Sequence, residues 1–256
     1  MKRTRFSLVT LRVLAFAGLV LLCNRPAYAD ELRVAVASNF SDAIKEIAQA
    51  FEKKTDHQIT LAFGSTGKHY AQIKNGAPFH AFFAADVERP KLLEEEGVAQ
   101  PDSRFTYAVG KVLLWSPTED LVDARGEVLN SGRFRYLALA NPKLAPYGNA
   151  AEQVLQAKGA WETLQNRMVR GENIGQTYQF VISGNAELGF VALSQVKKPG
   201  ATITGSYWAP PQSFYDPIEQ QAVLLKNNVV ARDFLSFVRS EPVRKIIQNY
   251  GYGTPE

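Results

Sequence analysis

The stretch Leu32-Arg33-Val34-Ala35-Val36-Ala37-Ser38-Asn39 decides the fold class, because it joins a strand to the start of a helix. Residues 32–37 form an apolar run that is typical of a buried strand, and the polar pair Ser38-Asn39 ends it. Beyond this pair, apolar residues recur at the i, i+3, i+4 and i+7 spacing of one helix face, at Ile44, Ile47, Ala48 and Phe51. The segment therefore predicts a β-strand that leads directly into an amphipathic helix.

The same strand-to-helix pattern recurs along the chain. We expect further strands at residues 58–63, 81–85, 135–140, 167–170 and 188–193. We expect helices that end near the glycines Gly76, Gly97, Gly159 and Gly184, and two last helices over residues 229–238 and 242–250. Alternation of this kind predicts an α/β fold in which mainly parallel sheets are covered by helices on both faces.

Two segments are typical of crossings between two lobes. Residues 105–115 are long for one strand, and an aromatic, proline-rich stretch from Tyr207 to Pro217 leads into another apolar run. We therefore expect a first lobe over residues 30–110, a second lobe over 111–208, and a return of residues 209–256 to the first lobe.

The first 29 residues have the features of a secretory signal peptide. Lys2, Arg3 and Arg5 form a positive n-region, residues 13–22 form an apolar h-region, and Ala27-Tyr28-Ala29 is an A-x-A cleavage site. The apolar run is too short to span a bilayer, which needs about 20 helical residues. We therefore expect cleavage after Ala29 and export to the periplasm.

Composition excludes several function classes. The 256-residue chain has a formal charge of +4, but the leader carries five Lys and Arg residues and no acid. The remainder has 24 Lys and Arg against 25 Asp and Glu, so no basic field indicates nucleic acid. The only cysteine, Cys23, lies in the leader, which excludes disulfides, cysteine nucleophiles and thiolate metal sites from the exported chain.

Motifs for catalysis or metal binding are missing. The histidines His57, His69 and His80 are 12 and 11 residues apart and form no HxxxH or HxxE pair, so a histidine metal site is not indicated. Neither a G-x-S-x-G elbow, a complete phosphate loop nor a strand-associated G-x-G-x-x-G occurs. Asp86 and Glu172 are the acids that an exported hydrolase could use, but no matched acid–base pair accompanies them. We expect no catalytic residues, no cofactor and no metal cation.

Four similar junctions carry the functional hypothesis. Each follows an expected strand, contains hydroxyl, amide or glycine residues, and opens a helix: Ala37-Ser38-Asn39, Gly64-Ser65-Thr66-Gly67, Ala145-Pro146-Tyr147-Gly148 and Asn173-Ile174-Gly175. Helix starts offer free N–H groups and the positive end of the macrodipole, so four of them across a cleft could surround one small anion. Taken singly, each junction is more often a structural cap. Few basic residues lie near them, which favours a fully deprotonated, doubly charged tetrahedral ion.

The chain resembles the periplasmic molybdate-binding proteins of molybdate ABC transporters, in particular the variant group with Asn in the first binding loop. The resemblance covers nearly all of the exported chain. It rests on Val36-Ala37-Ser38-Asn39-Phe40, Phe63-Gly64-Ser65-Thr66-Gly67, Tyr70-Ala71-Gln72-Ile73, Asn75-Gly76-Ala77-Pro78-Phe79, Phe83-Ala84-Ala85-Asp86, Arg104-Phe105-Thr106-Tyr107-Ala108-Val109-Gly110-Lys111, Asn141-Pro142, Ala145-Pro146-Tyr147-Gly148 and Leu188-Gly189-Phe190-Val191-Ala192-Leu193.

This resemblance implies a two-lobed type II periplasmic binding protein that takes molybdate, and also tungstate, into the cleft between its lobes. The ligand residues that it implies are Ser38, Asn39, Thr66, Tyr147 and Ile174. Ser38 and Thr66 would use hydroxyl and backbone N–H groups, and the other three mainly backbone N–H groups. It also implies an inner-membrane ABC permease as partner, and a shuttling receptor is most simply a monomer.

Two departures leave alternatives open. Many relatives place a tyrosine on the oxyanion from a segment that matches residues 189–193, where this chain has Ala192, so selectivity against sulfate is open. Ser65 stands next to Thr66, and a shift of one residue would exchange their roles. The competing hypotheses are the same fold with sulfate or phosphate as ligand, and an exported hydrolase.

Overall fold

Strand β1 (Leu32–Ala37) lies inside the first of two sheets, and all its side chains except that of Arg33 are buried. The computed structural model describes residues 31–254. The first sheet has the strand order β2 (Ile59–Gly64), β1, β3 (Ala81–Phe83), β10 (Ile218–Leu224) and β4 (Phe105–Gly110). The segment that predicted the fold class thus supplies an inner strand, as its apolar run indicated.

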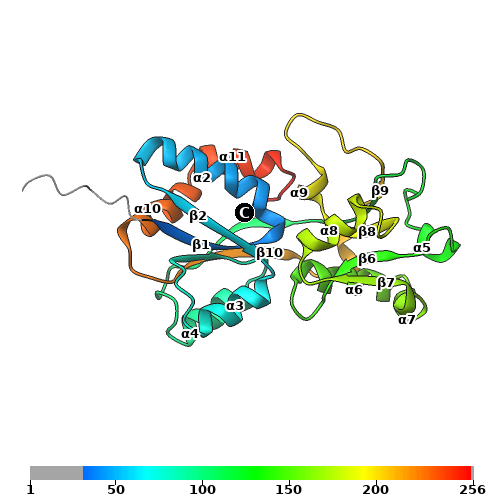
Figure 1. Cartoon of the computed structure of the whole chain (residues 1–256), viewed down its shortest axis with the longest axis horizontal. Helices are drawn as coiled ribbons and strands as arrows, with labels where there is room; N and C mark the ends of the chain where they lie inside the picture. The colour runs from blue at the N-terminus through cyan, green and yellow to red at the C-terminus, as the bar shows by residue number, and fades with distance from the viewer. Residues whose placement is uncertain (1–30, 255–256) are drawn as a thin grey trace, which may run out of the picture. The chain divides into compact units, whose positions relative to one another are not determined.

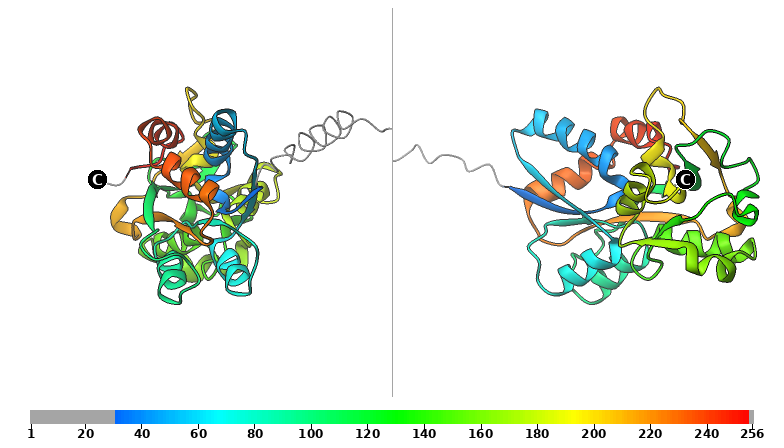
Figure 2. Two further views of the ribbon diagram at one scale, coloured as in Figure 1. Left: turned by 90° about the vertical axis from the view of Figure 1, so that its left-hand side faces the viewer. Right: turned by 45° about the vertical axis from the view of Figure 1, so that its right-hand side comes forward.

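Helices cover both faces of this first sheet (Figures 1 and 2). One face carries α2 (Ser41–Thr55), α10 (Val229–Val238) and α11 (Glu241–Asn249), and the other carries α3 (Thr66–Lys74) and α4 (Glu88–Glu95). Alternation along β1 explains the two layers, because Val34 and Val36 pack toward α2 and α10 whereas Ala35 packs toward α3 and α4.

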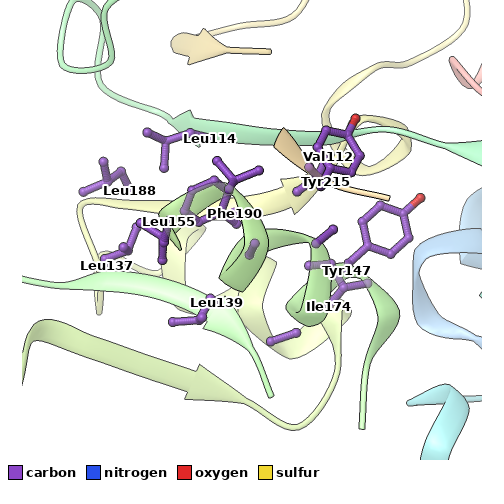
Figure 3. Close-up of a cluster of buried hydrophobic side chains, with 14 of the residues drawn as sticks. Val112, Leu114, Leu137, Leu139, Tyr147, Leu155, Ile174, Leu188, Phe190 and Tyr215 are labelled. Carbon is purple, nitrogen blue, oxygen red and sulfur yellow. The ribbon is translucent and has the colours of Figure 1, made fainter. Parts of the chain in front are cut away.

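The second sheet has the order β7 (Met168–Gly171), β6 (Leu137–Ala140), β8 (Leu188–Ala192), β5 (Val112–Ser116) and β9 (Ser206–Trp208). Helix α6 (Pro146–Ala157) covers one face, where a cluster of aliphatic and aromatic side chains forms the core (Figure 3). Helix α8 (Ile174–Ile182) covers the other face. The remaining elements are short: η1 (Ser38–Phe40), α5 (Val128–Ser131), α7 (Trp161–Leu164), η2 (Gln165–Arg167), α9 (Leu193–Val196) and η3 (Gln212–Phe214).

The two-sheet α/β architecture confirms the predicted fold class, but the expectation of mainly parallel sheets is wrong. Each sheet has two parallel and two antiparallel strand pairs. The antiparallel pairs all involve β10 or β5. Each of these two strands comes directly after a connection from the other sheet. Each therefore runs antiparallel to the strands of the βα units beside it.

The stretch from Phe105 to Trp115 is divided between the sheets as a crossing requires. Strand β4 belongs to the first sheet and β5 to the second, with Lys111 between them. Strand β10 returns to the first sheet after η3. The strands therefore belong to the first sheet, then to the second sheet and then again to the first, which is the order expected for the two lobes. The lobe boundaries at residues 110 and 208 stay a prediction.

Most element boundaries lie within two residues of those expected. The helix-ending glycines Gly76, Gly97, Gly159 and Gly184 have positive φ values of 66–83°, the left-handed conformation that glycine adopts without strain. Asp86 does not cap α4 from the N-cap position, which Val87 occupies, although its Oδ1 accepts from the Arg89 N–H at 3.1 Å. The expected signal peptide lies outside the described residues. Within residues 31–254, no helix has the length and apolar character needed to cross a membrane.

Candidate functional site

The four junctions meet at one small cavity between the two sheets. It is lined by Ala37, Ser38, Asn39, Gly64, Ser65, Thr66, Ala85, Ala145, Pro146, Tyr147, Asn173 and Ile174. The structure thus brings together all five predicted ligand residues. They come from η1 after β1, α3 after β2, α6 after β6 and α8 after β7, at the carboxyl ends of parallel strands. Their role as ligands stays a prediction.

Backbone N–H groups are the main donors at this cavity. Thr66 and Ile174 are the first residues of α3 and α8, and Tyr147 is the second residue of α6. N–H groups in the first helical turn have no acceptor within their own helix. Pro146 has no N–H to donate, so α6 presents the Tyr147 N–H as its first donor. Three helix starts and the 3₁₀ turn therefore direct positive partial charge to one place.

Ser65 and Thr66 have different roles in the second loop. Ser65 Oγ accepts from the Lys68 N–H at 3.2 Å, which is the contact of a helix N-cap. Thr66 Oγ1 accepts from the Ala85 N–H at 3.0 Å and keeps its own hydrogen to donate. Both side chains are buried at the cavity. Each hydroxyl accepts one bond and keeps its own hydrogen to donate, so the choice of Thr66 over Ser65 as the ligand of this loop stays a prediction.

The lobes already contact each other around the cavity. Ser38 Oγ accepts from the Gly175 N–H at 3.0 Å, and the Gly67 N–H donates to the Leu144 carbonyl at 2.9 Å. A Cβ at Gly67 would lie 3.1 Å from that carbonyl oxygen, so glycine permits the close approach. These bonds join residues of the first-sheet loops to residues of the second-sheet loops, which is the closed arrangement of a two-lobed protein.

The wall of the cavity is almost uncharged. Of the residues described, those that line the cavity include no charged side chain. Lys68 Nζ lies 2.5 Å from Glu172 Oε1, and both side chains are about half exposed. Burial lowers the pKa of His69, the other basic residue near the second loop, which favours its neutral form at neutral pH. An anion here would therefore be held by dipoles and hydroxyl groups.

A larger cavity of about 210 Å³ lies beside this one and has the opposite electrostatic character. It shares Ala85 and Pro146 with the small cavity, but its wall includes Asp86, Glu88, Asp216 and Glu219. Such a wall repels anions. Over residues 31–254, no three His, Cys, Asp or Glu side chains are grouped as metal ligands would be. The acids named for a hydrolase are ion-paired, Asp86 with Arg89 and Glu172 with Lys68.

Comparison with known proteins identifies the family. The model of the family described as bacterial extracellular solute-binding protein matches residues 32–253. The chain belongs to this solute-binding protein family. The molybdate-binding protein ModA of Azotobacter vinelandii is 49% identical over 251 residues, covering 97% of this chain and 98% of the relative. ModA of Rhodobacter capsulatus is 48% identical over 250 residues, covering 96% and 97%.

A solved structure agrees with these relatives. The periplasmic molybdate-binding protein of Azotobacter vinelandii superposes with a TM-score of 0.86 at 43% identity, covering 88% of this chain and all of that chain. A sulfate-binding protein of Mycobacterium tuberculosis has a TM-score of 0.73 at 11% identity, which shows a shared fold alone. The two-lobed type II periplasmic binding fold is therefore that of this solute-binding protein.

Sequence reasoning missed a buried polar cluster beside the cavity of this solute-binding protein. Gln220, Tyr107, Tyr252 and Ser194 all contact Asn39 or Tyr147, or each other, and each is at most 5% exposed. Gln220 lies where the register of β10 with β4 shifts by one residue, and no sequence pattern announces such a bulge. Ala192 is fully buried at the end of β8 and does not line the cavity.

Proposed function

We propose that this protein is a periplasmic receptor that binds molybdate between its lobes and delivers it to an inner-membrane ABC permease. The observation that carries this proposal is the convergence of Ser38, Asn39, Thr66, Tyr147 and Ile174 on one cavity at four helix or turn starts. The identity of about half with two proteins named molybdate-binding supports the choice of ion. In this proposal the protein is a monomer, performs no chemical step and loses its leader after Ala29.

The chemistry of the donor set favours a fully deprotonated ion. Backbone N–H groups and the Thr66 hydroxyl can all donate, and a tetrahedral dianion without a proton can only accept. An ion that keeps a proton needs an acceptor as well. The carboxylates of Glu172 and Asp86, each next in sequence to a lining residue, do not line the cavity and are paired with Lys68 and Arg89. The unpaired acceptor that the lining residues do offer is Asn39 Oδ1, so donors outnumber acceptors, and this balance favours molybdate and tungstate over monohydrogen phosphate.

Several such bonds account for tight binding without a cation. A hydrogen bond to a charged group contributes about 1.5–3 kcal/mol. Four or more of them can exceed the cost of association and give micromolar or tighter binding, about −8 kcal/mol or beyond. Because donors come from both lobes, only the closed arrangement presents all of them to one ion.

Binding also requires the loops to adjust. The cavity has a volume of about 10 Å³, enough for about one water-sized sphere. A tetrahedral ion of five heavy atoms needs more room, so the lobes must close less tightly around it than they do here. Discrimination from sulfate, which has the same charge and geometry, then depends on how far the loops separate when the lobes close.

Isothermal titration calorimetry with molybdate, tungstate, sulfate and phosphate tests the proposal. We expect micromolar or tighter binding of molybdate and tungstate, and much weaker binding of sulfate and phosphate. Tight binding of sulfate with none of molybdate would overturn it. Elemental analysis of the protein purified from molybdate-supplemented cells is an independent check, since stoichiometric molybdenum is expected and stoichiometric sulfur beyond the Met and Cys content is not.

A further inference from the structure

Gln220 joins the binding loops of the two lobes. Its side chain is fully buried, and its Oε1 accepts from Asn39 Nδ2 at 2.8 Å. Its Nε2 donates to the hydroxyl of Tyr147 at 3.1 Å. Asn39 belongs to the first-sheet loop after β1, and Tyr147 belongs to the start of α6 in the second lobe. One carboxamide therefore connects two residues that line the proposed anion cavity from opposite sides.

The place of Gln220 in the fold suits this connection. It lies in β10, the strand that returns the chain from the second lobe to the first, at the shift in register with β4. A bulge of this kind re-aims a side chain relative to its neighbours. Gly110, the last residue of β4 before the chain crosses to the second sheet, leaves room for the contact, because a Cβ there would lie 2.1 Å from Tyr147 Oη and 2.6 Å from Gln220 Nε2.

Asn39 depends on this cluster for its orientation. Its Nδ2 donates to Gln220 and to the Tyr252 hydroxyl at 3.0 Å, and its carbonyl accepts from Tyr252 and Ser194. Its Oδ1 is buried and has no hydrogen-bond partner among the residues described. The amide is therefore fixed through one end only, and Gln220 is its shortest side-chain contact.

Tyr147 is held in a similar way. In Figure 3 its ring lies at the edge of the apolar cluster of the second lobe, and its hydroxyl points away from the aliphatic side chains. That hydroxyl meets Gln220, which also accepts from the Tyr107 hydroxyl at 3.0 Å. Losing the carboxamide would leave the buried Tyr147 hydroxyl without this partner and would remove one of two partners from Asn39 Nδ2 and from the Tyr107 hydroxyl, and unpaired buried groups are costly.

We propose that Gln220 is a positioning residue that couples closure of the lobes to anion binding, by tying the first binding loop at Asn39 to the second-lobe loop at Tyr147. It does not contact the anion. This inference rests on the proposed function for its ligand, but the tie between the lobes is a property of the chain itself. According to this inference, β10 affects the affinity for the ligand although it belongs to none of the four binding loops.

The test compares Gln220→Leu with the matched control Gln221→Leu in the full chain. Gln221 is the next residue of the same strand, but its side chain bonds Arg104 and Thr106 instead of the binding loops. We expect Gln220→Leu to weaken molybdate binding about tenfold or more, mostly through faster dissociation. We expect Gln221→Leu to change the dissociation constant less than about threefold. Equal losses in both variants, or wild-type affinity in Gln220→Leu, would overturn the proposal.

A conservative variant separates positioning from mere folding. In Gln220→Glu the protonated acid can accept from Asn39 and donate to Tyr147 as the amide does, whereas the carboxylate can only accept and places a negative charge beside the anion cavity. The titratable groups facing this position are the hydroxyls of Tyr107, Tyr147 and Tyr252, whose pKa values burial raises, and Asp86 lies near Tyr107. We expect the affinity ratio of variant to wild type to recover from about pH 8 to about pH 5. An affinity of Gln220→Glu at about pH 5 that is as low as that of Gln220→Leu contradicts the proposal.

A readout without ligand keeps the two proposals distinguishable. Small-angle X-ray scattering of the ligand-free proteins should give a larger radius of gyration for Gln220→Leu than for wild type and for Gln221→Leu. Equal radii would overturn the coupling. If wild type does not bind molybdate, the proposed function fails, and the scattering result still decides whether Gln220 holds the lobes together.

Discussion

The hydroxyl oxygen of Ser38 accepts a hydrogen bond from the backbone N–H of Gly175 at 3.0 Å, across the boundary between the lobes. Gly175 is the second residue of α8, so its N–H is one of the groups that the helix leaves unpaired. The same hydroxyl keeps its hydrogen for the cavity that Ser38 lines. One side chain thus contacts the opposing lobe and lines the cavity in which we propose that the ligand binds.

Ser38→Ala should therefore lower molybdate affinity by more than the loss of one donor. We expect a decrease of about tenfold to a hundredfold, because a charge-assisted bond and a bond between the lobes both disappear. Ser38→Thr keeps the hydroxyl and is the control. Calorimetric titration of both variants checks this, and unchanged affinity in Ser38→Ala would show that the hydroxyl is not a ligand.

Thr66→Ala and Ser65→Ala should separate the two roles in the second loop. Thr66→Ala should weaken binding about tenfold, since it removes a charge-assisted donor. Ser65→Ala removes the cap of α3 and should lower the free energy of unfolding by about 1 kcal/mol. Calorimetry and denaturant titration on each variant measure the two effects. The reverse pattern would exchange the ligand role from Thr66 to Ser65.

The ion pair between Lys68 and Glu172 should contribute little. Both groups are about half exposed, and such pairs contribute about 0–1 kcal/mol to stability. Lys68→Gln should change the molybdate dissociation constant less than about fivefold, because no cation is needed in the proposed site. Glu172→Gln serves as its partner variant in a double-mutant cycle. A hundredfold loss of affinity in Lys68→Gln would mean that the lysine is itself a ligand.

Stability should depend on the protonation of His69. Histidine in the unfolded chain titrates near its ordinary pKa of about 6.5, whereas burial lowers the pKa of folded His69. The unfolded state therefore takes up a proton at a higher pH than the folded state does. The free energy of unfolding should fall as the pH drops below about 6.5, until the folded histidine is also protonated.

The measurement is the thermal midpoint of the ligand-free protein between about pH 8 and about pH 5. His69→Gln should flatten this dependence. His69 packs edge-on against Phe79 and Phe82, so the variant is compared by its slope with pH rather than by its absolute midpoint. A slope that persists in His69→Gln would assign it to other groups.

Most helices and strands could be predicted from the sequence, because the signals that define each βα unit lie within that unit. The apolar run of β1, the helical spacing after it and the glycine at each helix end all act over a few residues. The directions of β5 and β10 could not be predicted, since they depend on which lobe the chain has just left. The alternation of strands and helices in the sequence therefore predicted more parallel strand pairs than the structure contains.

The four junctions of the candidate site were predictable from local sequence for the same reason, whereas the individual ligand residues were implied by the family resemblance and stay a prediction. Ser38, Thr66 and Ile174 lie in junctions whose residue types announce a helix start. The residues behind them, such as Gln220 and Tyr252, lie more than 180 positions from Asn39 and meet it only through tertiary packing. A bulge and a buried amide leave no periodic signal, so the support of the site had to come from the structure.

The absence of charged side chains from the cavity wall, among the residues that the structure describes, has a consequence for where such a receptor can work. Dissolved ions screen attraction between exposed opposite charges, but they screen short contacts with buried dipoles far less. Capture should therefore remain almost as strong in brine as in fresh water. A receptor that is exported, as we propose for this one, should therefore keep its ligand when the salt concentration around the cell changes.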